Sequence, residues 1–460
     1  MENCDSSDIA DGLEEAYVVE EQGSKNSVES DDSNGDEMGL IRKEFEHHEK
    51  GVSRINNGSF GTCPASVMDS QAKWAGLWLQ QPDKFYFGPL QDGILQSRRI
   101  VAQIINAEQV EEVSLVDNVT TAVAVVLQEV AWGFMEKKFQ KGDVVLMLHY
   151  AYGAVKKAIN AYAGRAGARI IEAELPFPVG SNDDIIDSFR AAVDKGKQNG
   201  GRIRLAVIDH VSSMPSVLIP VKELVRICRE EGVDQVFVDG AHAIGNIEID
   251  MQDIDADFYT SNLHKWFFCP PSVAFLYCRH SFHSNIHHPI VSHEFGKGLP
   301  AESAWVGTRD YSAQLCVPSA LEFTKKFQGG IEAIRRKNHE RVVAMGEMLA
   351  EAWGTQLGTS PELASAMVMV ALPNCLEIHS AQDALDLRTR LRKEFAVEVP
   401  IYYRALDKDL QSNRGASFRA YARISHQIYN TLDDYLKFRD AILHLVAEAS
   451  KVEEGVCLKK

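Results

Sequence analysis

The chain has 460 residues, of which 45% are hydrophobic, and its formal net charge is −17. This length supports one large domain with a smaller one beside it. The negative charge argues against a nucleic-acid partner and against binding to anionic membranes, because both need a basic face, and no apolar run is long enough to span a membrane.

The first 38 residues hold 13 acidic residues and one lysine, so they carry −12 of the net charge. This serine- and acid-rich sequence has too little apolar surface to fold alone, and we predict a disordered acidic tail over residues 1–45. It lacks the composition of a signal peptide or an organellar presequence, so we expect a cytoplasmic protein. The eight cysteines show no paired CxxC spacing, which argues against zinc sites and disulfides.

Between residues 113 and 277, short apolar runs alternate with segments of helical periodicity, a pattern typical of parallel strands joined by crossover helices. We predict an α/β domain over residues 46–330, with a mainly parallel sheet covered by helices. The predicted strands are residues 143–148, 168–171, 203–209, 235–239 and 273–277, and the predicted crossover helices are residues 153–163 and 221–231.

A second unit follows the glycine pair at positions 329 and 330. It begins with a long helical segment and contains two predicted strands, residues 367–372 and 418–424. We therefore expect a smaller α+β domain over residues 331–455.

Lys265 and Asp239 are the most informative residues of the chain. Asp239 ends a predicted apolar strand, and Lys265 follows 26 residues later in the sequence SNLHKW. A lysine amine can form a Schiff base with the aldehyde of pyridoxal phosphate, and a strand-end carboxylate can keep the pyridine nitrogen of that cofactor protonated. Each residue alone is usually a surface lysine or a helix cap. Together with the motifs below, they predict a pyridoxal phosphate site at the carboxyl edge of the sheet.

Two other segments are expected at the same edge. Residues 118–122 follow a short apolar run and open a helix, so Thr120 and Thr121 can bind a phosphate, with a simple helix cap as the alternative. Residues 149–154 follow a predicted strand and offer rings that can stack on a pyridine. We favour Tyr152 for stacking and place His149 second, with an ordinary buried aromatic residue as the alternative.

Taken as an ordered set, these motifs resemble those of the class V aminotransferase superfamily. Its members are fold-type I pyridoxal phosphate enzymes that include cysteine desulfurases, isopenicillin N epimerase-like proteins and plant L-cysteine desulfhydrases. The resemblance covers roughly residues 50–445. The motifs that carry it are residues 56–61, 118–121, 239–242, 262–266, 307–310 and 423–425.

The resemblance implies roles around the cofactor. Lys265 would form the Schiff base, and Asp239 would pair with the pyridinium nitrogen. His242 would border the ring. His264 would lie near the phosphate, together with one of the two threonines at positions 120 and 121.

The resemblance also implies how the substrate and a second subunit meet the site. Arg423 would bind the substrate carboxylate, and its planar fork suits that pairing, with a surface ion pair as the alternative. Asn57 would also contact the substrate. Thr308 would reach the phosphate of a neighbouring subunit, which implies a homodimer.

The implied reaction is α,β-elimination of L-cysteine to hydrogen sulfide, pyruvate and ammonia, with Lys265 as the base at Cα. A cysteine desulfurase would need a cysteine on a mobile loop, and residues 402–418 contain none. A racemase or epimerase stays open, because His149 or Tyr152 can serve on the opposite face. A cofactor-binding scaffold is the non-enzyme alternative, and the joint presence of Lys265, Asp239 and Arg423 argues against it.

Five histidines between positions 280 and 293 raise the question of a metal site. They are His280, His283, His287, His288 and His293. No second cluster of cysteine, aspartate or glutamate stands at a ligand spacing, so we expect no metal and a loop near the cofactor instead.

Overall fold

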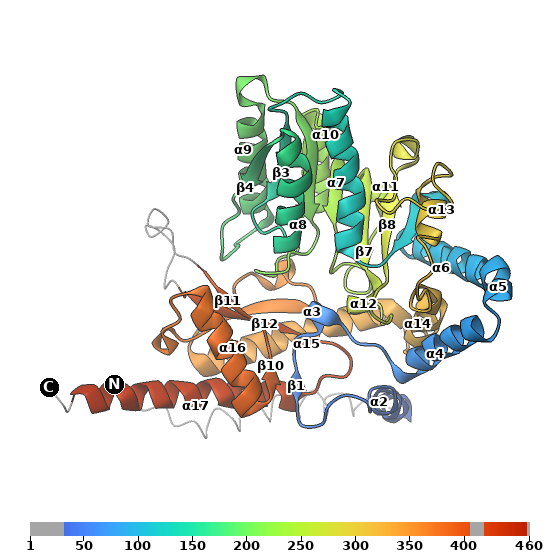
Figure 1. Cartoon of the computed structure of the whole chain (residues 1–460). Coiled ribbons are helices and arrows are strands. Elements are labelled where there is room, and N and C mark those ends of the chain that lie inside the picture. Colours follow the sequence, from blue (N-terminus) through green and yellow to red (C-terminus); the bar gives the residue numbers. More distant parts are fainter. Residues whose placement is uncertain (1–31, 405–417, 458–460) are drawn as a thin grey trace.

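A seven-stranded sheet forms the centre of the larger part of the molecule (Figure 1). The computed structural model describes residues 32–404 and 418–457. The strand order is β2-β8-β7-β6-β5-β3-β4, and neighbouring strands are parallel except where β8 pairs with β2 and β7. The predicted α/β fold with a mainly parallel sheet is confirmed. The strands are β2 (Val113–Val116), β3 (Val144–Leu148), β4 (Arg169–Ala173), β5 (Ile203–Asp209), β6 (Val236–Asp239), β7 (Phe258–Asn262) and β8 (Ala274–Cys278).

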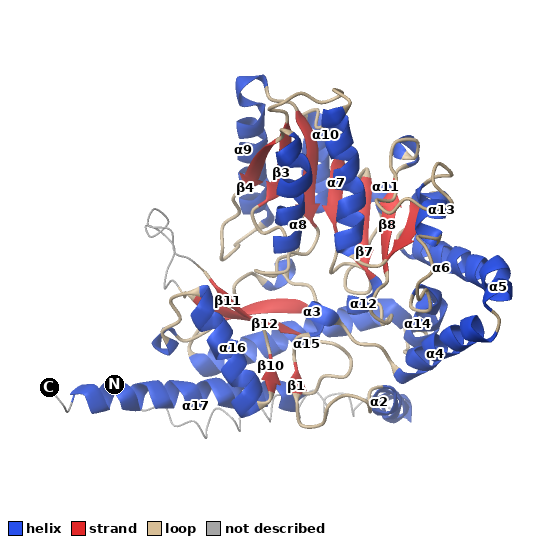
Figure 2. Ribbon diagram, viewed as in Figure 1, coloured by secondary structure: helices blue, strands red, loops and turns tan. Residues whose placement is uncertain are grey.

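Helices cover both faces of this sheet (Figure 2). The helices α7 and α8 pack on one face, and α9 and α10 pack on the other. Most strands are rich in apolar residues, and all of them except the edge strand β4 are buried along their whole length, as expected for a sheet that is covered on both sides. The helices up to residue 324 are α2 (Asp32–Glu44), α3 (Asn57–Phe60), α4 (Ala65–Gln80), α5 (Pro82–Phe85), α6 (Gln91–Ile104), α7 (Val119–Met135), α8 (Gly153–Ile159), α9 (Asn182–Lys197), α10 (Val221–Glu230), α11 (Met251–Ile254), α12 (Leu263–Trp266), α13 (Leu299–Ala304) and α14 (Val317–Thr324).

The register of the sheet brings two carboxylates side by side. Asp209 ends β5, Asp239 ends β6, and the two residues are partners in the parallel ladder. Side chains of register partners point to the same face of a sheet. That face is the one covered by α7 and α8, since Val207 and Phe237, two residues earlier in each strand, belong to its core.

The sequence does not predict β7, because three of its five residues are polar. Its polar side chains are nevertheless buried and hydrogen-bonded. The Thr260 hydroxyl donates to the Phe275 carbonyl oxygen over 2.6 Å, and the Ser261 hydroxyl accepts from the Ile244 N–H over 3.0 Å. These hydrogen bonds allow polar side chains to be buried in β7, so this strand lacks the apolar pattern that identifies the other strands.

A second, three-stranded antiparallel sheet with the order β11-β12-β9 forms a smaller unit. The predicted strands 367–372 and 418–424 correspond to β9 and β12. The two-residue strand β1 and Ile55, from the N-terminal part of the chain, also join this unit. Its elements are β1 (Ser53–Arg54), β9 (Met367–Ala371), β10 (Val397–Glu398), β11 (Ile401–Tyr403), β12 (Ala420–Ser425), α15 (Gly330–Trp353), α16 (Ala381–Phe395) and α17 (Leu432–Cys457). We propose that the two units correspond to the domains expected on either side of residue 330.

Part of the expected tail is a helix. Residues 1–31 lie outside the described part of the chain, whereas α2 covers positions 32–44. Ile41 and Phe45 are buried in the main core, and the Glu44 carboxylate binds the Lys326 amine and the Ser66 N–H. The tail is predicted from the average charge of the whole segment, and that average takes no account of these apolar residues at its end. The predicted tail therefore includes residues that form α2.

Candidate active site

Lys265 lies in α12, the short helix that follows β7 at the carboxyl edge of the large sheet. Its amine is half-buried, 3.1 Å from Nε2 of His242. Burial and the nearby Arg423 guanidinium lower the pKa of Lys265 to about 7. A large share of this amine is therefore uncharged near neutral pH, which makes it both a nucleophile and a base.

Asp239 is only 3% exposed at the end of β6. One carboxylate oxygen accepts the Ala241 N–H over 2.9 Å, while burial raises the pKa of the group. The neighbouring Asp209 has a buried oxygen without a hydrogen-bond partner in the described structure, and burial beside Asp239 raises its pKa strongly. The pair resists carrying two negative charges, so a cationic group placed against Asp239 would be stabilised.

His242 connects the turn after β6 to α12. Its Nδ1 lies 3.4 Å from the indole nitrogen of Trp266, and its Nε2 faces Lys265. Burial lowers the pKa of His242 well below its usual value, so the ring is neutral. The carbonyl of His242 accepts the side-chain amide of Asn246 over 2.9 Å, which holds the backbone in place as well.

The backbone around Lys265 is held by α3. The Asn57 side-chain amide donates to the Lys265 carbonyl oxygen over 2.9 Å, and its oxygen accepts the Tyr429 hydroxyl over 3.0 Å. Gly61 follows the last residue of α3 and has a positive φ of 70°. A Cβ at this position would lie 1.8 Å from the His264 carbonyl oxygen, so α3 can approach the lysine turn this closely only with glycine here. Asn57 is 1% exposed, so both ends of its side-chain amide are enclosed with these two partners.

Arg423 lies in β12 of the smaller unit and is 2% exposed. Its four hydrogen bonds in the described part of the chain go to neutral oxygens, namely Asn56 Oδ1 (2.9 Å), Ser59 Oγ (2.8 Å), Ser213 O (2.9 Å) and Ser213 Oγ (3.1 Å). Burial lowers the pKa of Arg423 to about 10, which still leaves it charged at neutral pH. The site thus contains a fixed cation suited to a carboxylate ligand.

The first turn of α7 supplies N–H groups at the same edge. Asn118 caps this helix by accepting the Thr121 N–H over 3.0 Å, and Asn262 accepts the Val119 N–H over 3.1 Å. Thr120 is exposed and Thr121 is half-buried. Asn262 stands three residues before Lys265, so the helix N-terminus and the lysine are joined through one side chain.

His264, on the other side of Lys265, is half-buried. Its Nδ1 lies 3.2 Å from the Val273 carbonyl oxygen, and burial lowers its pKa to about 4, so the ring is neutral at physiological pH. It can therefore offer a neutral hydrogen bond, but not a charge, to a phosphate.

His149 and Tyr152, the two ring candidates, differ in their surroundings. Tyr152 is 55% exposed and stands at the N-cap of α8. Nδ1 of His149 lies 2.8 Å from the Leu175 backbone nitrogen and 3.1 Å from the Ala173 carbonyl oxygen, so it accepts from the first or donates to the second according to the tautomer of the ring. Continuing the β3–β5 register, in which Met147 pairs with Val207, places His149 beside Asp209.

Thr308 is exposed in the loop after α13. The preceding Gly307 has a φ of 108°, and the following Arg309 forms an ion pair with Asp117, immediately before the N-cap of α7. The structure thus places Thr308 on a loop that is attached next to the helix N-terminus of its own chain.

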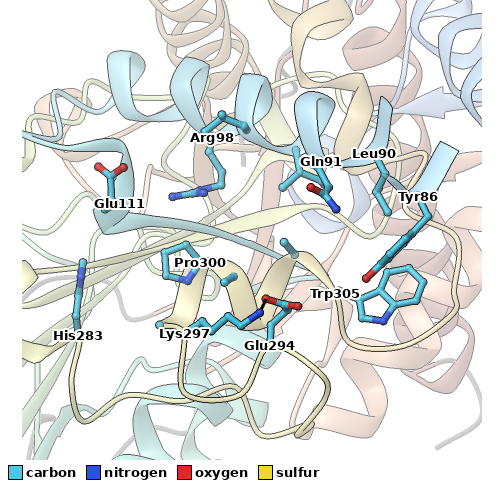
Figure 3. Close-up of a pocket in the computed structure, with 15 residues that line it drawn as sticks. Tyr86, Leu90, Gln91, Arg98, Glu111, His283, Glu294, Lys297, Pro300 and Trp305 are labelled. Atoms are coloured by element: carbon cyan, nitrogen blue, oxygen red, sulfur yellow. Dashed lines mark ion pairs between the residues drawn. The ribbon is translucent and has the colours of Figure 1, made fainter. Parts of the chain in front are cut away.

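In the histidine-rich segment, the side chain of His288 lies near the Arg309–Asp117 pair, and its pKa is lowered mainly by burial. His287 Nδ1 lies 2.8 Å from Glu302 Oε1, and His283 Nε2 lies 2.9 Å from the Cys278 carbonyl oxygen. Among the described residues no group of histidine, cysteine and carboxylate side chains is arranged to hold a metal ion. A cavity of about 600 Å³ lies between α6 and the loop at 283–305, and Trp305 lines it but none of the predicted site residues does (Figure 3).

Some residues of the site carry no signal in the sequence. Ser213 and Tyr429 lie outside the recognised motifs, and only the fold brings them to Arg423 and Asn57. Ser59 lies within a recognised motif, but nothing in its spacing indicates a contact with Arg423.

The model of the family described as "Aminotransferase class-V" matches residues 89–434. This chain belongs to the class-V aminotransferase family. The family implies pyridoxal phosphate as the cofactor, as the sequence predicts. A solved structure of a C-DES variant with glycine linked to its pyridoxal phosphate has a TM-score of 0.63 at 18% identity, and the match covers 89% of this chain and 98% of that one.

Two Arabidopsis thaliana relatives are similar over most of the chain. The protein named "L-cysteine desulfhydrase" is 55% identical, with 89% of this chain and 91% of that protein covered. The protein named "Probable L-cysteine desulfhydrase, chloroplastic" is 56% identical, with 91% and 88% covered.

The name of the second relative points away from a cytoplasmic location, so that prediction is wrong. The acidic composition of the first 38 residues is not a guide to the compartment. As for membranes, none of the helices in the described ranges is long and apolar enough to cross one.

Proposed function

We propose that this protein is a pyridoxal phosphate-dependent L-cysteine desulfhydrase, a carbon-sulfur lyase. The main support for the proposal is the presence of two basic side chains, Lys265 and Arg423, at one site. Lys265 has a pKa near 7, while Arg423 keeps its charge and bonds only to neutral oxygens in the described structure. A reactive amine and a carboxylate receptor are what an amino-acid substrate requires. The names of two relatives at 55% and 56% identity support L-cysteine as that substrate.

The residues of the site fit pyridoxal phosphate. When bound, this cofactor supplies an aldehyde that condenses with amines and a ring that withdraws electrons from the substrate Cα. The first turn of α7, with the hydroxyl groups of Thr120 and Thr121, suits its phosphate, because the helix dipole favours an anion at this end. Asp239 is placed at the strand end to hold a proton on the ring nitrogen. We assign the ring-covering role to His149, since Tyr152 is exposed at a helix cap.

The chain's own groups then perform the proton transfers. Arg423 binds the substrate carboxylate in a bidentate pair and so fixes the orientation of Cα. Lys265, released as a neutral amine, takes the Cα proton. The sulfur leaves Cβ as hydrosulfide, and hydrolysis of the remaining three-carbon fragment gives pyruvate and ammonia. One water is consumed for each L-cysteine.

Persulfide transfer is the main rival within the family. It requires a cysteine thiolate near the substrate sulfur, and the sequence has no cysteine from residue 402 to residue 418. Residues 405–417 of this segment lie outside the described structure. Cys375 is exposed beside a different pocket, next to α16 and α17. The cysteine content therefore favours elimination.

We also propose that the protein acts as a homodimer in which Thr308 contributes to the phosphate site of the partner subunit. Thr308 is exposed, as expected for a residue that serves another chain. The loop before α13 exposes three large apolar side chains, Ile290, Val291 and Phe295, which are between 51% and 65% exposed. An apolar group of this kind is typical of a protein–protein contact.

Product identification tests the proposal. The purified holoenzyme is incubated with L-cysteine, and sulfide, pyruvate, alanine and D-cysteine are measured. Equimolar sulfide and pyruvate are expected. Alanine would indicate desulfurase action, D-cysteine would indicate racemisation, and absence of all products would indicate a scaffold. Lys265→Ala should abolish turnover, whereas Lys297→Ala, which removes an exposed lysine paired with Glu294, should not.

A further inference from the structure

Trp266 stands next to Lys265 and is 1% exposed. Its indole ring packs in a small core with Val211 and Met367, which is a sufficient reason for an apolar side chain at this position. The indole N–H, however, points at Nδ1 of His242 over 3.4 Å. A buried tryptophan needs a partner for this group, and here the partner belongs to the active site.

This contact determines where His242 carries its proton. An indole nitrogen can only donate a hydrogen bond, so Nδ1 of His242 must accept and carries no hydrogen. The neutral ring therefore has its hydrogen on Nε2. That nitrogen lies 3.1 Å from the Lys265 amine.

The proton state of Lys265 follows from the same geometry. An Nε2–H can donate but cannot accept, and a protonated lysine amine has donors only. The 3.1 Å contact is thus a hydrogen bond only when Lys265 is neutral, with its lone pair directed at His242. The lowered pKa of Lys265 agrees with this arrangement.

Neighbouring groups hold the arrangement in place. Asn246 fixes the backbone of His242 through a 2.9 Å bond to its carbonyl, and it also accepts the Ala366 N–H over 2.8 Å. At Gly58 of α3, an added Cβ would lie 3.4 Å from the indole ring. The ring of Trp266 therefore has little freedom to turn away from His242.

We propose that Trp266 is a positioning residue that fixes the tautomer of His242, so that the Nε2–H of His242 donates to Lys265 and keeps its amine neutral. The proposal builds on the proposed function in that Lys265 is taken as the cofactor lysine. The other groups that face Lys265 and His242 are Asp239 from β6, Arg423 from β12 and His264 from α12. Trp266→Phe leaves all of them in place and removes the N–H.

The first test reads the tautomer directly. Nitrogen NMR of histidine-labelled apoenzyme distinguishes Nδ1–H from Nε2–H rings, and His242→Gln identifies the signal. The expected result is an Nε2–H ring in the wild type at neutral pH. An Nδ1–H ring in the wild type would overturn the proposal, and this measurement does not depend on whether a variant folds.

The second test follows the rate at which the apoenzyme takes up pyridoxal phosphate as a function of pH. Without the indole N–H, His242 can accept from protonated Lys265, so the midpoint of the profile should rise by up to about one pH unit in Trp266→Phe. Trp353→Phe is the matched control, because Trp353 is also buried and its N–H binds the Arg439 carbonyl oxygen over 3.3 Å in the smaller unit.

If Trp266 has a purely structural role, Trp266→Phe should lower the stability of the protein, but the midpoint of its pH profile should equal that of Trp353→Phe. That result would refute the proposal. Failure of the proposed function gives a different result. If the wild type released no sulfide from L-cysteine, the NMR signal of His242 would still report whether Trp266 fixes its tautomer.

Discussion

Lys265 and Arg423 are two basic side chains whose pKa values respond differently to burial. Burial acts on both, but the pKa of Lys265 falls to about 7, while that of Arg423 falls only to about 10. The difference follows from their ordinary pKa values, because that of arginine is higher, and four hydrogen bonds to neutral oxygens hold the Arg423 guanidinium in place. One residue can therefore exchange a proton at neutral pH, and the other serves as a permanent charge.

Substitution of Arg423 should act on substrate binding. Arg423→Ala removes the partner of the substrate carboxylate, and losing one half of a buried charge pair costs about 2 kcal/mol or more, or a KM about 30-fold higher. Arg423→Lys keeps the charge but lacks the planar guanidinium group, so its KM should lie between those of the wild type and Arg423→Ala. Steady-state kinetics with L-cysteine measures both. An unchanged KM in Arg423→Ala would remove this residue from the substrate site.

Asn57 should behave differently from Arg423. Asn57→Ala frees the Lys265 carbonyl, so the lysine is placed less accurately and kcat should fall by about tenfold or more with a smaller change in KM. Tyr429→Phe removes only the hydroxyl that binds Asn57 and should give a weaker effect in the same direction. A rise in KM alone would instead support the direct substrate contact that the sequence suggests.

At the scale of secondary-structure elements, the first turn of α7 connects fold and chemistry. The helix begins directly after β2, at the edge where β5 and β6 also end, so its N-terminus lies at the same edge of the sheet as the strand-end carboxyls and α12. The Asn262 side chain ties α7 to the lysine turn. A change at this helix end should therefore affect cofactor binding as well as stability.

The prediction for this element compares two helix caps. Asn118→Ala removes the cap of α7 and should cost about 1 kcal/mol of stability and also weaken pyridoxal phosphate binding. Ser181→Ala removes the cap of α9, on the other face of the sheet, and should cost a similar amount with unchanged cofactor affinity. Thermal unfolding and cofactor titration test this. Equal cofactor affinity in both variants would show that α7 does not bind the phosphate.

Apolar periodicity was sufficient to predict most strands of the sheet. It failed at β7, whose buried polar side chains are bonded to distant backbone, and at α2, where a strong acidic charge masks Ile41 and Phe45. The site was predictable where neighbouring residues form a motif. The contacts of Ser213 and Tyr429 depend on the packing of the two units against each other, and no local pattern encodes them.

At the scale of the whole molecule, the site lies where two units meet. Lys265 and Asp239 come from the large sheet, whereas Arg423 comes from the smaller sheet and α3 bridges them. Substrate that binds Arg423 and reacts at the lysine would thus contact both units. The expected second subunit would add a further residue, Thr308, to this site.

The proposed dimer gives a further prediction. Sedimentation velocity should show a species of twice the 51.1 kDa chain mass. Phe295→Glu, which places a charge on the exposed apolar loop before α13, should shift the protein toward monomer and weaken cofactor binding, because Thr308 of the partner is then lost. Leu385→Glu, at an exposed apolar position of α16, is the matched control and should leave the dimer intact. A monomeric wild type with full activity would contradict the shared site.

The most direct measurement is the location of the cofactor on the chain. The holoenzyme is treated with borohydride, which fixes pyridoxal phosphate to the amine that holds it, and the digested peptides are mapped by mass spectrometry. We expect one modified peptide, with the pyridoxyl group on Lys265. A modification at another lysine, or none in a protein that still releases sulfide from L-cysteine, would contradict it.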